Sequence, residues 1–436
     1  MKLWSKQNTA THELVEQFTV GRDREFDLLL AEHDVIGSLA HTQMLEKSGL
    51  LTAHERVEIH RELHQILGEI RAQNFQIEVD VEDVHSQVEL LLTRRIGESG
   101  KKIHAGRSRN DQVAVDIKLY LRAELQEVKT LTLNLFDLLL DLSERHRNTL
   151  LPGYTHLQIA MPSSFGLWFG AYAESLVDDL ETVAAAYRVV NKNPLGSGAG
   201  YGSSFPLDRR LTTELLGFDT LHFNAVYAQM SRGKTERIVA QALSNIAATL
   251  GRFSMDVCLY LSQNFSFISF PPELTTGSSI MPHKKNPDIF ELTRARCNRL
   301  QALPNELVLL LTNLPSGYHR DLQLTKEILF PGIESLKSCL AMLTHALAHI
   351  EVRSDILQEE KYRYLFSVES VNELVNSGLS FREAYREVGN RIEAGTFEHD
   401  PTRGLRHTHE GSLGNLCTEE IRAEMKKVAA QIPDKT

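Results

Sequence analysis

Three long stretches without glycine or proline constrain the fold of this chain more than any other feature. The stretch 113–142 has apolar residues at helical spacing, and the stretches 235–250 and 288–302 continue the same pattern. Apolar residues that recur every three or four positions form one face of an α-helix. A helix over 113–142 would cross a whole domain, because each residue adds about 1.5 Å to its length. Since no alternating stretch exceeds about five residues, the sequence predicts an all-α fold with a central bundle of long helices.

Glycine and proline gather between these stretches and indicate where the chain divides. A chain of 436 residues is long enough for about three domains of ~150 residues each. We expect an N-terminal helical domain over 1–105, a central long-helix bundle over 106–355 and a C-terminal helical domain over 356–436.

Composition and charge exclude several classes of protein. The net charge is −10, and the basic residues are scattered, which argues against nucleic-acid binding. The four cysteines lie far apart without a CxxC pair, so neither a disulfide framework nor a zinc ribbon is expected. The beginning of the chain lacks an apolar segment of signal-peptide length, and the most apolar tract, 131–142, is shorter than the ~20 residues that span a bilayer. We therefore expect a cytoplasmic protein without a membrane partner.

The loop 276–288 has the composition of an anion site. Its end, Asn286-Pro287-Asp288, predicts a helix start, with Asn286 as N-cap and Pro287 as first helical residue. Before it lie a glycine, two serines and two lysines. A loop that leads into the positive end of a helix suits a carboxylate or phosphate ligand. The alternative is a surface loop with solvated lysines.

Two further segments contain groups suited to binding or proton transfer. The segment 104–112, His-Ala-Gly-Arg-Ser-Arg-Asn-Asp-Gln, offers arginines that could bind a carboxylate in a bidentate manner. Alternatively, its arginines pair with aspartates in a polar turn. The segment 152–158, Pro-Gly-Tyr-Thr-His-Leu-Gln, places His156 where it could act as a general acid or base, or could have a structural role only.

Taken together, these segments resemble a known enzyme family. The pattern Gly-Ser-Ser-x-Met-Pro-x-Lys-Lys-Asn-Pro over 277–287 resembles the signature of the fumarase/aspartase superfamily. The segments 104–112 and 152–158 resemble the argininosuccinate lyase branch, as do 82–85, 195–199 and 318–326. The resemblance extends from about residue 17 to residue 390.

This resemblance implies an activity and an assembly. It implies reversible β-elimination of argininosuccinate to L-arginine and fumarate, with neither a metal nor an organic cofactor. It also implies a homotetramer in which each active site is shared by three subunits.

The resemblance implies catalytic roles for four side chains. Ser278 corresponds to the base that removes the proton, and His156 to the acid that protonates the leaving nitrogen. Lys284 corresponds to a residue that stabilises developing negative charge, and Glu291 to one that orients the imidazole.

The remaining correspondences concern substrate binding. Those for the succinyl carboxylates are Ser108, Arg109, Asn110 and Thr155, with Asn286 on the signature loop. His85 corresponds to a histidine that lines the same pocket. The third segment contributes Tyr318, Arg320, Gln323 and Lys326, the last two toward the amino-acid end of the substrate.

The chain departs from the family pattern in positions that concern the arginine portion of the substrate. Gly233 stands where many members have arginine, Met161 where glutamine is usual, and Leu324-Thr325 where an acidic pair is frequent. Two alternatives therefore stay open. One is a sister lyase acting on another succinyl-amine, and the other is a catalytically silent, crystallin-like homologue.

Overall fold

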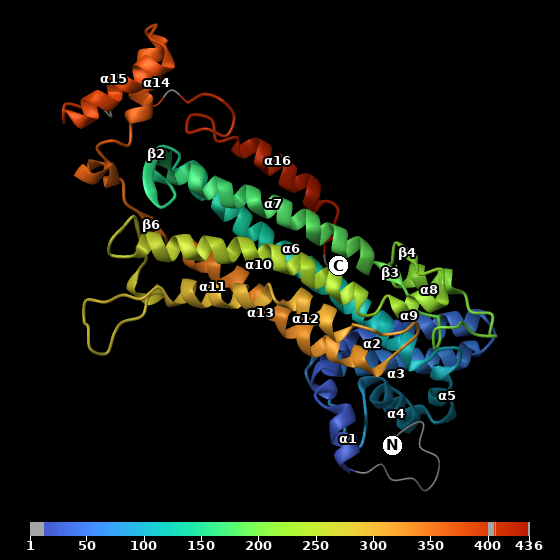
Figure 1. Ribbon diagram of the computed structural model, residues 1–436. Coiled ribbons are helices and arrows are strands. Elements are labelled where there is room, and N and C mark those ends of the chain that lie inside the picture. The colour runs from blue at the N-terminus through green and yellow to red at the C-terminus, as the bar shows by residue number, and fades with distance from the viewer. Residues whose placement is uncertain (1–12, 400–404, 406, 435–436) are drawn as a thin grey trace.

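The computed structural model describes residues 13–399, 405 and 407–434, and it confirms the all-α prediction (Figure 1). The three stretches predicted as helical lie in α6, α10 and α11. The central helices are α6 (Arg109–Arg145), α7 (Phe165–Val190), α10 (Lys234–Leu261), α11 (Asp288–Leu300), α12 (Leu303–Leu310) and α13 (Thr325–Leu347).

Further helices lie before, between and after the bundle helices. The N-terminal ones are α1 (Glu13–Val20), α2 (Asp23–Lys47), α3 (Ala53–Arg71), α4 (Val84–Ile96) and α5 (Glu98–Lys101). Between bundle helices lie α8 (Arg209–Leu215) and α9 (Ala225–Met230). The C-terminal ones are α14 (Ser367–Asn376), α15 (Phe381–Glu393) and α16 (Thr418–Ala429).

The hydrophobic core follows the long helices. One continuous cluster of buried side chains joins α6, α7, α10, α11 and α13, and a second cluster joins α2, α3 and α4. The last helix, α16, lies along α7 (Figure 1) and buries Ile421, Met425 and Val428 in the first cluster. By contrast, α14 and α15 share a small core of their own at one end of the bundle. The boundaries at 105 and 355 remain a prediction.

The strands are short and form three two-stranded sheets within the described residues. They are β1 (Leu150–Thr155), β2 (Gln158–Ser164), β3 (Lys192–Asn193), β4 (Thr220–Leu221), β5 (Ile268–Ser269) and β6 (Glu351–Val352). Of the three pairs, β1–β2 and β5–β6 are antiparallel and β3–β4 is parallel.

The hairpin β1–β2 departs from the sequence-based expectation. Its strands are six and seven residues long, whereas we expected none longer than about five, because proline and glycine at 152–153 indicate a break. Both residues lie inside β1, beside an irregularity in the pairing. A Cβ on Gly153 would lie 2.8 Å from the carbonyl oxygen of Met161, so only glycine permits this close approach between the strands.

Two further expectations can be compared with the structure. All four cysteines are free thiols, as their spacing predicts. In the described part of the chain, no helix combines the length and the apolar character required to cross a bilayer.

Candidate active site

A cavity of about 240 Å³ lies where the beginnings of α2, α4 and α6 meet the segment before α13. The residues that line it are Asp23, Asp27, Glu82, Asp83, His85, Arg109, Asn110, Val113, Arg232, Tyr318, Arg320, Gln323 and Lys326. The structure thus brings together seven of the predicted binding residues from three separate segments of the chain.

Helix starts orient part of this cavity. Asp83 is the N-cap of α4 and accepts a hydrogen bond from the Ser86 N–H at 2.8 Å. Ser108 caps α6 in the same way, and its own N–H donates to the Asp111 carboxylate at 2.8 Å. Arg109 and Asn110, the first residues of α6, therefore lie at the positive end of a long helix, which favours a bound anion.

The cations of the cavity are paired with carboxylates. Arg109 lies 3.1 Å from Asp83, and Lys326 lies 2.6 Å from Asp27 and also contacts Asp23. Burial lowers the pKa of Lys326, but the charges of the two aspartates outweigh that effect and raise it. The alternative considered for the 104–112 segment, an arginine–aspartate pair, is therefore present, although the aspartate comes from α4.

The segment before α13 is bound to the N-terminal helices. Arg320 donates to Glu82 and to the Thr19 carbonyl, each at 3.0 Å. The side chain of Gln323 donates to the same Thr19 carbonyl at 3.1 Å. The last turn of α1 thus contacts Arg320 and also Gln323, which was predicted to bind the amino-acid end of the substrate.

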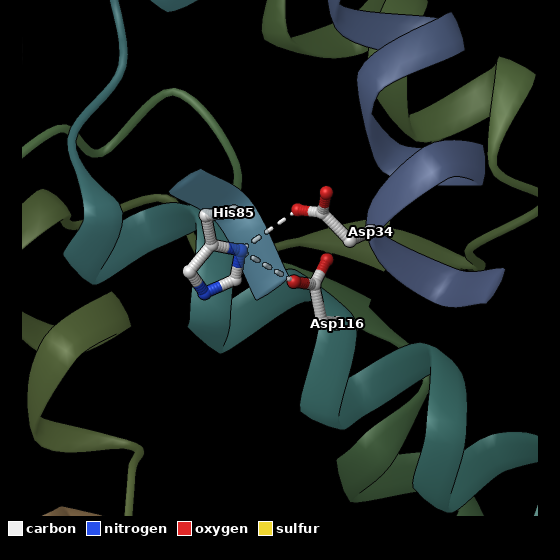
Figure 2. A group of neighbouring side chains, drawn as sticks. All are labelled: Asp34, His85 and Asp116. Atoms are coloured by element: carbon white, nitrogen blue, oxygen red, sulfur yellow. Dashed lines mark hydrogen bonds and ion pairs between the residues drawn. The ribbon is translucent and has the colours of Figure 1, made fainter. Parts of the chain in front are cut away.

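His85 lies against two buried carboxylates behind this cavity (Figure 2). Its Nδ1 is 2.8 Å from Asp34 Oδ1 on α2 and 3.4 Å from Asp116 Oδ2 on α6. Burial lowers the pKa of His85, yet the charge of Asp34 and its hydrogen bond to the ring more than compensate and raise it to about 9. Burial, followed by the charge of Asp34, raises the pKa of Asp116 well above its ordinary value. The imidazole is therefore cationic at neutral pH.

The spacing of this trio also deserves comparison with a metal site, since one potential ligand atom from each residue lies within 4.8 Å of the others. In the structure, however, His85 Nδ1 donates to Asp34 Oδ1, and Gln112 Nε2 donates to the same oxygen at 2.6 Å. With carboxylates as its neighbours, the imidazole forms an ion pair when its Nδ1 holds a proton.

The signature loop closes on itself at its base and leaves its tip exposed. The backbones of Thr276 and Asn286 pair, with the Asn286 N–H 2.8 Å from the Thr276 carbonyl. Within the loop, Ser278 Oγ accepts hydrogen bonds from the Met281 and Ile280 N–H groups at 3.1 and 3.3 Å. Lys284 is exposed. Two amides thus point at the Ser278 oxygen, and such donors favour its charged, deprotonated form.

The start of α11 lies one residue later than predicted. Pro287 is the N-cap and Asp288 the first helical residue. Instead of capping the helix, the Asn286 side chain donates to Thr276 Oγ1 at 3.3 Å and so helps to close the loop. Glu291 lies exposed in the first turn of α11.

His156 is at the tip of the β1–β2 hairpin. Thr155 pairs with Gln158, and the two residues between them form the turn. His156 and Leu157 both have positive φ, at 54° and 59°, as a tight hairpin turn requires. This backbone conformation is uncommon for such side chains, and it leaves the imidazole exposed.

The structure does not bring the predicted catalytic residues to the cavity of the same chain. Arg109 begins α6, whereas the hairpin with His156 follows the other end of this helix. A helix of 37 residues is about 55 Å long. The segment between α10 and α11 extends from the same end of the bundle as the hairpin (Figure 1). Ser278, Lys284, Asn286 and Glu291 are therefore remote from the cavity, and so are Thr155 and His156.

Sequence reasoning missed several cavity residues. Asp23 and Asp27 line the cavity, and Asp34 lies behind it on the same face of α2, because spacings of four and seven residues correspond to whole helical turns. Acidic residues on a face that is otherwise buried are the signal that could have identified them. Arg232 was missed because the family pattern predicts an arginine at position 233, where this chain has glycine.

Gly233 explains how Arg232 enters the cavity. Gly233 has φ of 74°, and a Cβ there would lie 2.6 Å from a methyl group of Leu311. The sharp turn before α10 places Arg232 between Glu236, 3.0 Å away, and the Leu322 carbonyl at 3.3 Å. Glycine at position 233 is thus required by the local backbone, and Arg232 beside it reaches the cavity.

Comparisons with known proteins agree with this architecture. A family model described as lyase matches residues 6–302. A protein named argininosuccinate lyase from Parabacteroides distasonis is 59% identical over 98% of this chain and 95% of its own length. Its namesake from Bacteroides thetaiotaomicron is 58% identical with the same coverage. The crystal structure of EDDS lyase in complex with formate superposes with a TM-score of 0.76 at 21% identity, covering 97% of this chain and 91% of that one.

The structural likeness establishes the fold, and the sequence matches establish the family. The chain belongs to the lyase family and, within it, to the argininosuccinate lyases.

Proposed function

We propose that this enzyme cleaves argininosuccinate to L-arginine and fumarate by β-elimination. The observation that supports this proposal most is identity of 58–59% with argininosuccinate lyases over nearly the whole chain, including the signature loop. The cavity adds a chemical argument, since Arg109, His85 and Lys326 offer cationic donors to carboxylates while Asp23 and Glu82 offer acceptors to a guanidinium or ammonium group.

The first chemical step removes a proton from the carbon next to a carboxylate. We assign this step to Ser278, whose oxygen accepts two backbone hydrogen bonds that stabilise the alkoxide needed for a base. The electron pair left on carbon is delocalised into the neighbouring carboxylate. Lys284 and Asn286 on the same loop are suited to hold that extra charge, and preorganised donors of this kind typically contribute 10²–10³ in rate each.

The second step breaks the carbon–nitrogen bond. The electron pair on carbon forms the double bond of fumarate, and the departing nitrogen takes a proton from His156. The exposed position of His156 at a hairpin tip leaves both of its ring nitrogens accessible to a partner. Glu291 is the carboxylate that we assign to orient this ring.

These assignments require the active site to be shared between subunits. Within one chain, the cavity and His156 lie at opposite ends of α6, about 55 Å apart. Exposed apolar side chains along the bundle favour association: Met255, Leu292, Leu309 and Met342, from α10, α11, α12 and α13, are 43–66% exposed. Such a surface is typical of an interface. We propose a homotetramer in which the cavity, the hairpin and the loop come from three chains.

A substrate panel tests the activity. Purified protein is given argininosuccinate, adenylosuccinate, aspartate or malate, and fumarate is followed by its absorbance near 240 nm. We expect argininosuccinate to be cleaved with the highest kcat/KM. Faster cleavage of adenylosuccinate would indicate the sister-lyase alternative, and no turnover of any of the four would indicate a silent homologue.

Mixing two inactive variants tests the shared site. Chains with Ser278→Ala still have His156, and chains with His156→Asn still have Ser278. A shared site in a mixed tetramer therefore contains both side chains when one variant chain supplies Ser278 and the other supplies His156. Activity should reappear after subunit exchange, which mass spectrometry verifies. A mixture of Ser278→Ala with Lys284→Met is the matched control, since both groups lie on one loop and no site regains both. Equal activity in the two mixtures would contradict the shared arrangement.

A further inference from the structure

In the trio Asp34, His85 and Asp116, two carboxylates face one imidazole, an arrangement that ordinary core packing does not require. His85 lines the cavity, while the carboxylates behind it come from two other helices, α2 and α6. Both aspartates are buried. Asp34 Oδ1 is paired with His85 and Gln112, whereas Asp34 Oδ2 and the Asp116 oxygens have no hydrogen-bond partner among the described residues, and Asp116 Oδ2 lies 3.4 Å from His85 Nδ1. Two adjacent buried carboxylates that share one cation are costly to a fold, which indicates that their position serves another purpose.

The ring has one engaged nitrogen and one free nitrogen. Nδ1 faces both aspartates, and Nε2 points away from them (Figure 2). Among the described residues, Nε2 has no hydrogen-bond partner. A ring held by Nδ1 in this way presents a fixed Nε2–H donor, because an imidazolium donates through both nitrogens.

We propose that Asp34 is a positioning residue that keeps His85 as a charged Nε2–H donor for a carboxylate of the substrate. The proposal rests on the proposed function for the identity of that substrate. Asp34 is the partner that supplies the charge, because Gln112 also donates to it and stabilises its carboxylate. Asp116 completes the pocket behind the ring as a neutral, protonated acid, since two adjacent buried carboxylates facing one cation do not both ionise readily.

Other charged groups near the ring do not replace Asp34. From the start of α4, Asp83 adds negative charge, but it is engaged with Arg109 and Ser86. In the segment before α6, the Arg107 guanidinium opposes a second positive charge nearby. Burial lowers the pKa of His104 to about 4, so this ring is neutral. Arg107 donates to Ser38 Oγ at 3.0 Å. Across the cavity lie Asp23, Asp27, Glu82, Arg232, Arg320 and Lys326, most of which pair with one another.

Binding of the two ends of the substrate tests the proposal without turnover. Isothermal titration calorimetry of the full-length enzyme with succinate, and separately with arginine, is performed between pH 6 and pH 10. For the end that His85 contacts, we expect Kd to stay level to about pH 8.5 and to rise about tenfold by pH 10. Affinity is lost as the ring loses its proton near pH 9, and one proton changes affinity about tenfold per pH unit.

Three variants separate the proposal from a structural role. In Asp34→Asn the loss of affinity should move to lower pH, but not fully to the ordinary pKa of histidine, because Asp116 can ionise beside the ring once Asp34 is neutral. In His85→Gln binding should be weaker by about 10–100-fold at pH 7 and should not follow this pH dependence. Asp179→Asn removes a buried carboxylate from α7 and should match the wild type.

Several results would overturn the proposal. One is an unchanged midpoint in Asp34→Asn, and another is wild-type affinity of His85→Gln for both ligands. If Asp34→Asn does not fold, the comparison of the wild type with His85→Gln tests the proposal. Loss of affinity near pH 9 that persists in His85→Gln contradicts the proposal, and its disappearance in this variant supports it. Because no step needs catalysis, a failure here is distinct from failure of the fumarate assay.

Discussion

The two ends of α6 present their functional side chains in opposite ways. At its N-terminal end, most cavity side chains are buried or half-buried, and the cations Arg109 and Lys326 are paired with carboxylates. At its C-terminal end, His156 is exposed at a hairpin tip, and the loop with Ser278 and Lys284 extends from the same end of the bundle. One end thus surrounds a cavity with paired charges, and the other carries exposed side chains that we propose to act in catalysis. Substitutions at the first end should therefore alter stability and binding together, and those at the second should alter turnover alone.

The largest effect should come from Ser278→Ala. We expect kcat to fall at least about 10³-fold, because the base is lost, while the melting temperature stays unchanged, since the side chain contacts only its own loop. Ser279→Ala is the matched control and should remain within tenfold of wild type. Activity of Ser278→Ala within tenfold of wild type would remove this residue from the role of base.

Lys326→Met should affect stability and KM together. It leaves Asp23 and Asp27 without their cation in a buried site, and breaking such a pair costs about 3–5 kcal/mol. Denaturant unfolding and steady-state kinetics measure the two effects. Lys337→Met, on the same helix but paired with Glu124 and Glu334 outside the cavity, should lower stability less and leave KM unchanged. Equal KM values for the two variants would contradict the proposed binding role.

The pH dependence of stability should reflect the raised pKa of His85. Because the folded protein holds this proton more tightly than the unfolded chain, the stabilisation is complete below about pH 6.5, the ordinary pKa of histidine, and is lost as pH rises through about 9. The shift corresponds to about 3 kcal/mol. Denaturant midpoints between pH 6 and pH 9.5 should fall in the wild type and change less in His85→Gln. If the midpoints of the wild type and of His85→Gln changed equally with pH, the pKa of His85 would not be raised by its neighbours.

The smallest effect should come from Ser108→Ala. Loss of this N-cap removes the acceptor for the Asn110 N–H and typically costs about 1 kcal/mol. Thermal unfolding measures it, and Ser164→Ala, at the N-cap of α7, is the comparison at the hairpin end. If Ser108 also binds substrate, KM rises in Ser108→Ala and not in Ser164→Ala. An unchanged KM in Ser108→Ala would show that Ser108 acts only as the N-cap of α6.

Much of the helical architecture could be predicted from local pattern. The apolar periodicity of 113–142 predicts α6, since a helix of that length needs only local hydrogen bonds and one buried face. The start of α11 was less predictable, because Asn286 can cap a helix or close a loop, and the contact with Thr276 decides between them. The β1–β2 hairpin was obscured by Pro152 and Gly153, whose tolerance depends on the opposite strand.

By itself, the sequence determined the class of fold, the motifs and the resemblance that led to the lyase family. Only the tertiary structure decided which of those motifs meet, because Arg109 and Lys326 are more than two hundred residues apart and approach through packing of α2, α4, α6 and α13. It also decided that His85 lies against Asp34 and Asp116 and that α6 keeps His156 away from the cavity. Charge states follow from such neighbours and from burial, which depend on distances in space and not on separation along the chain.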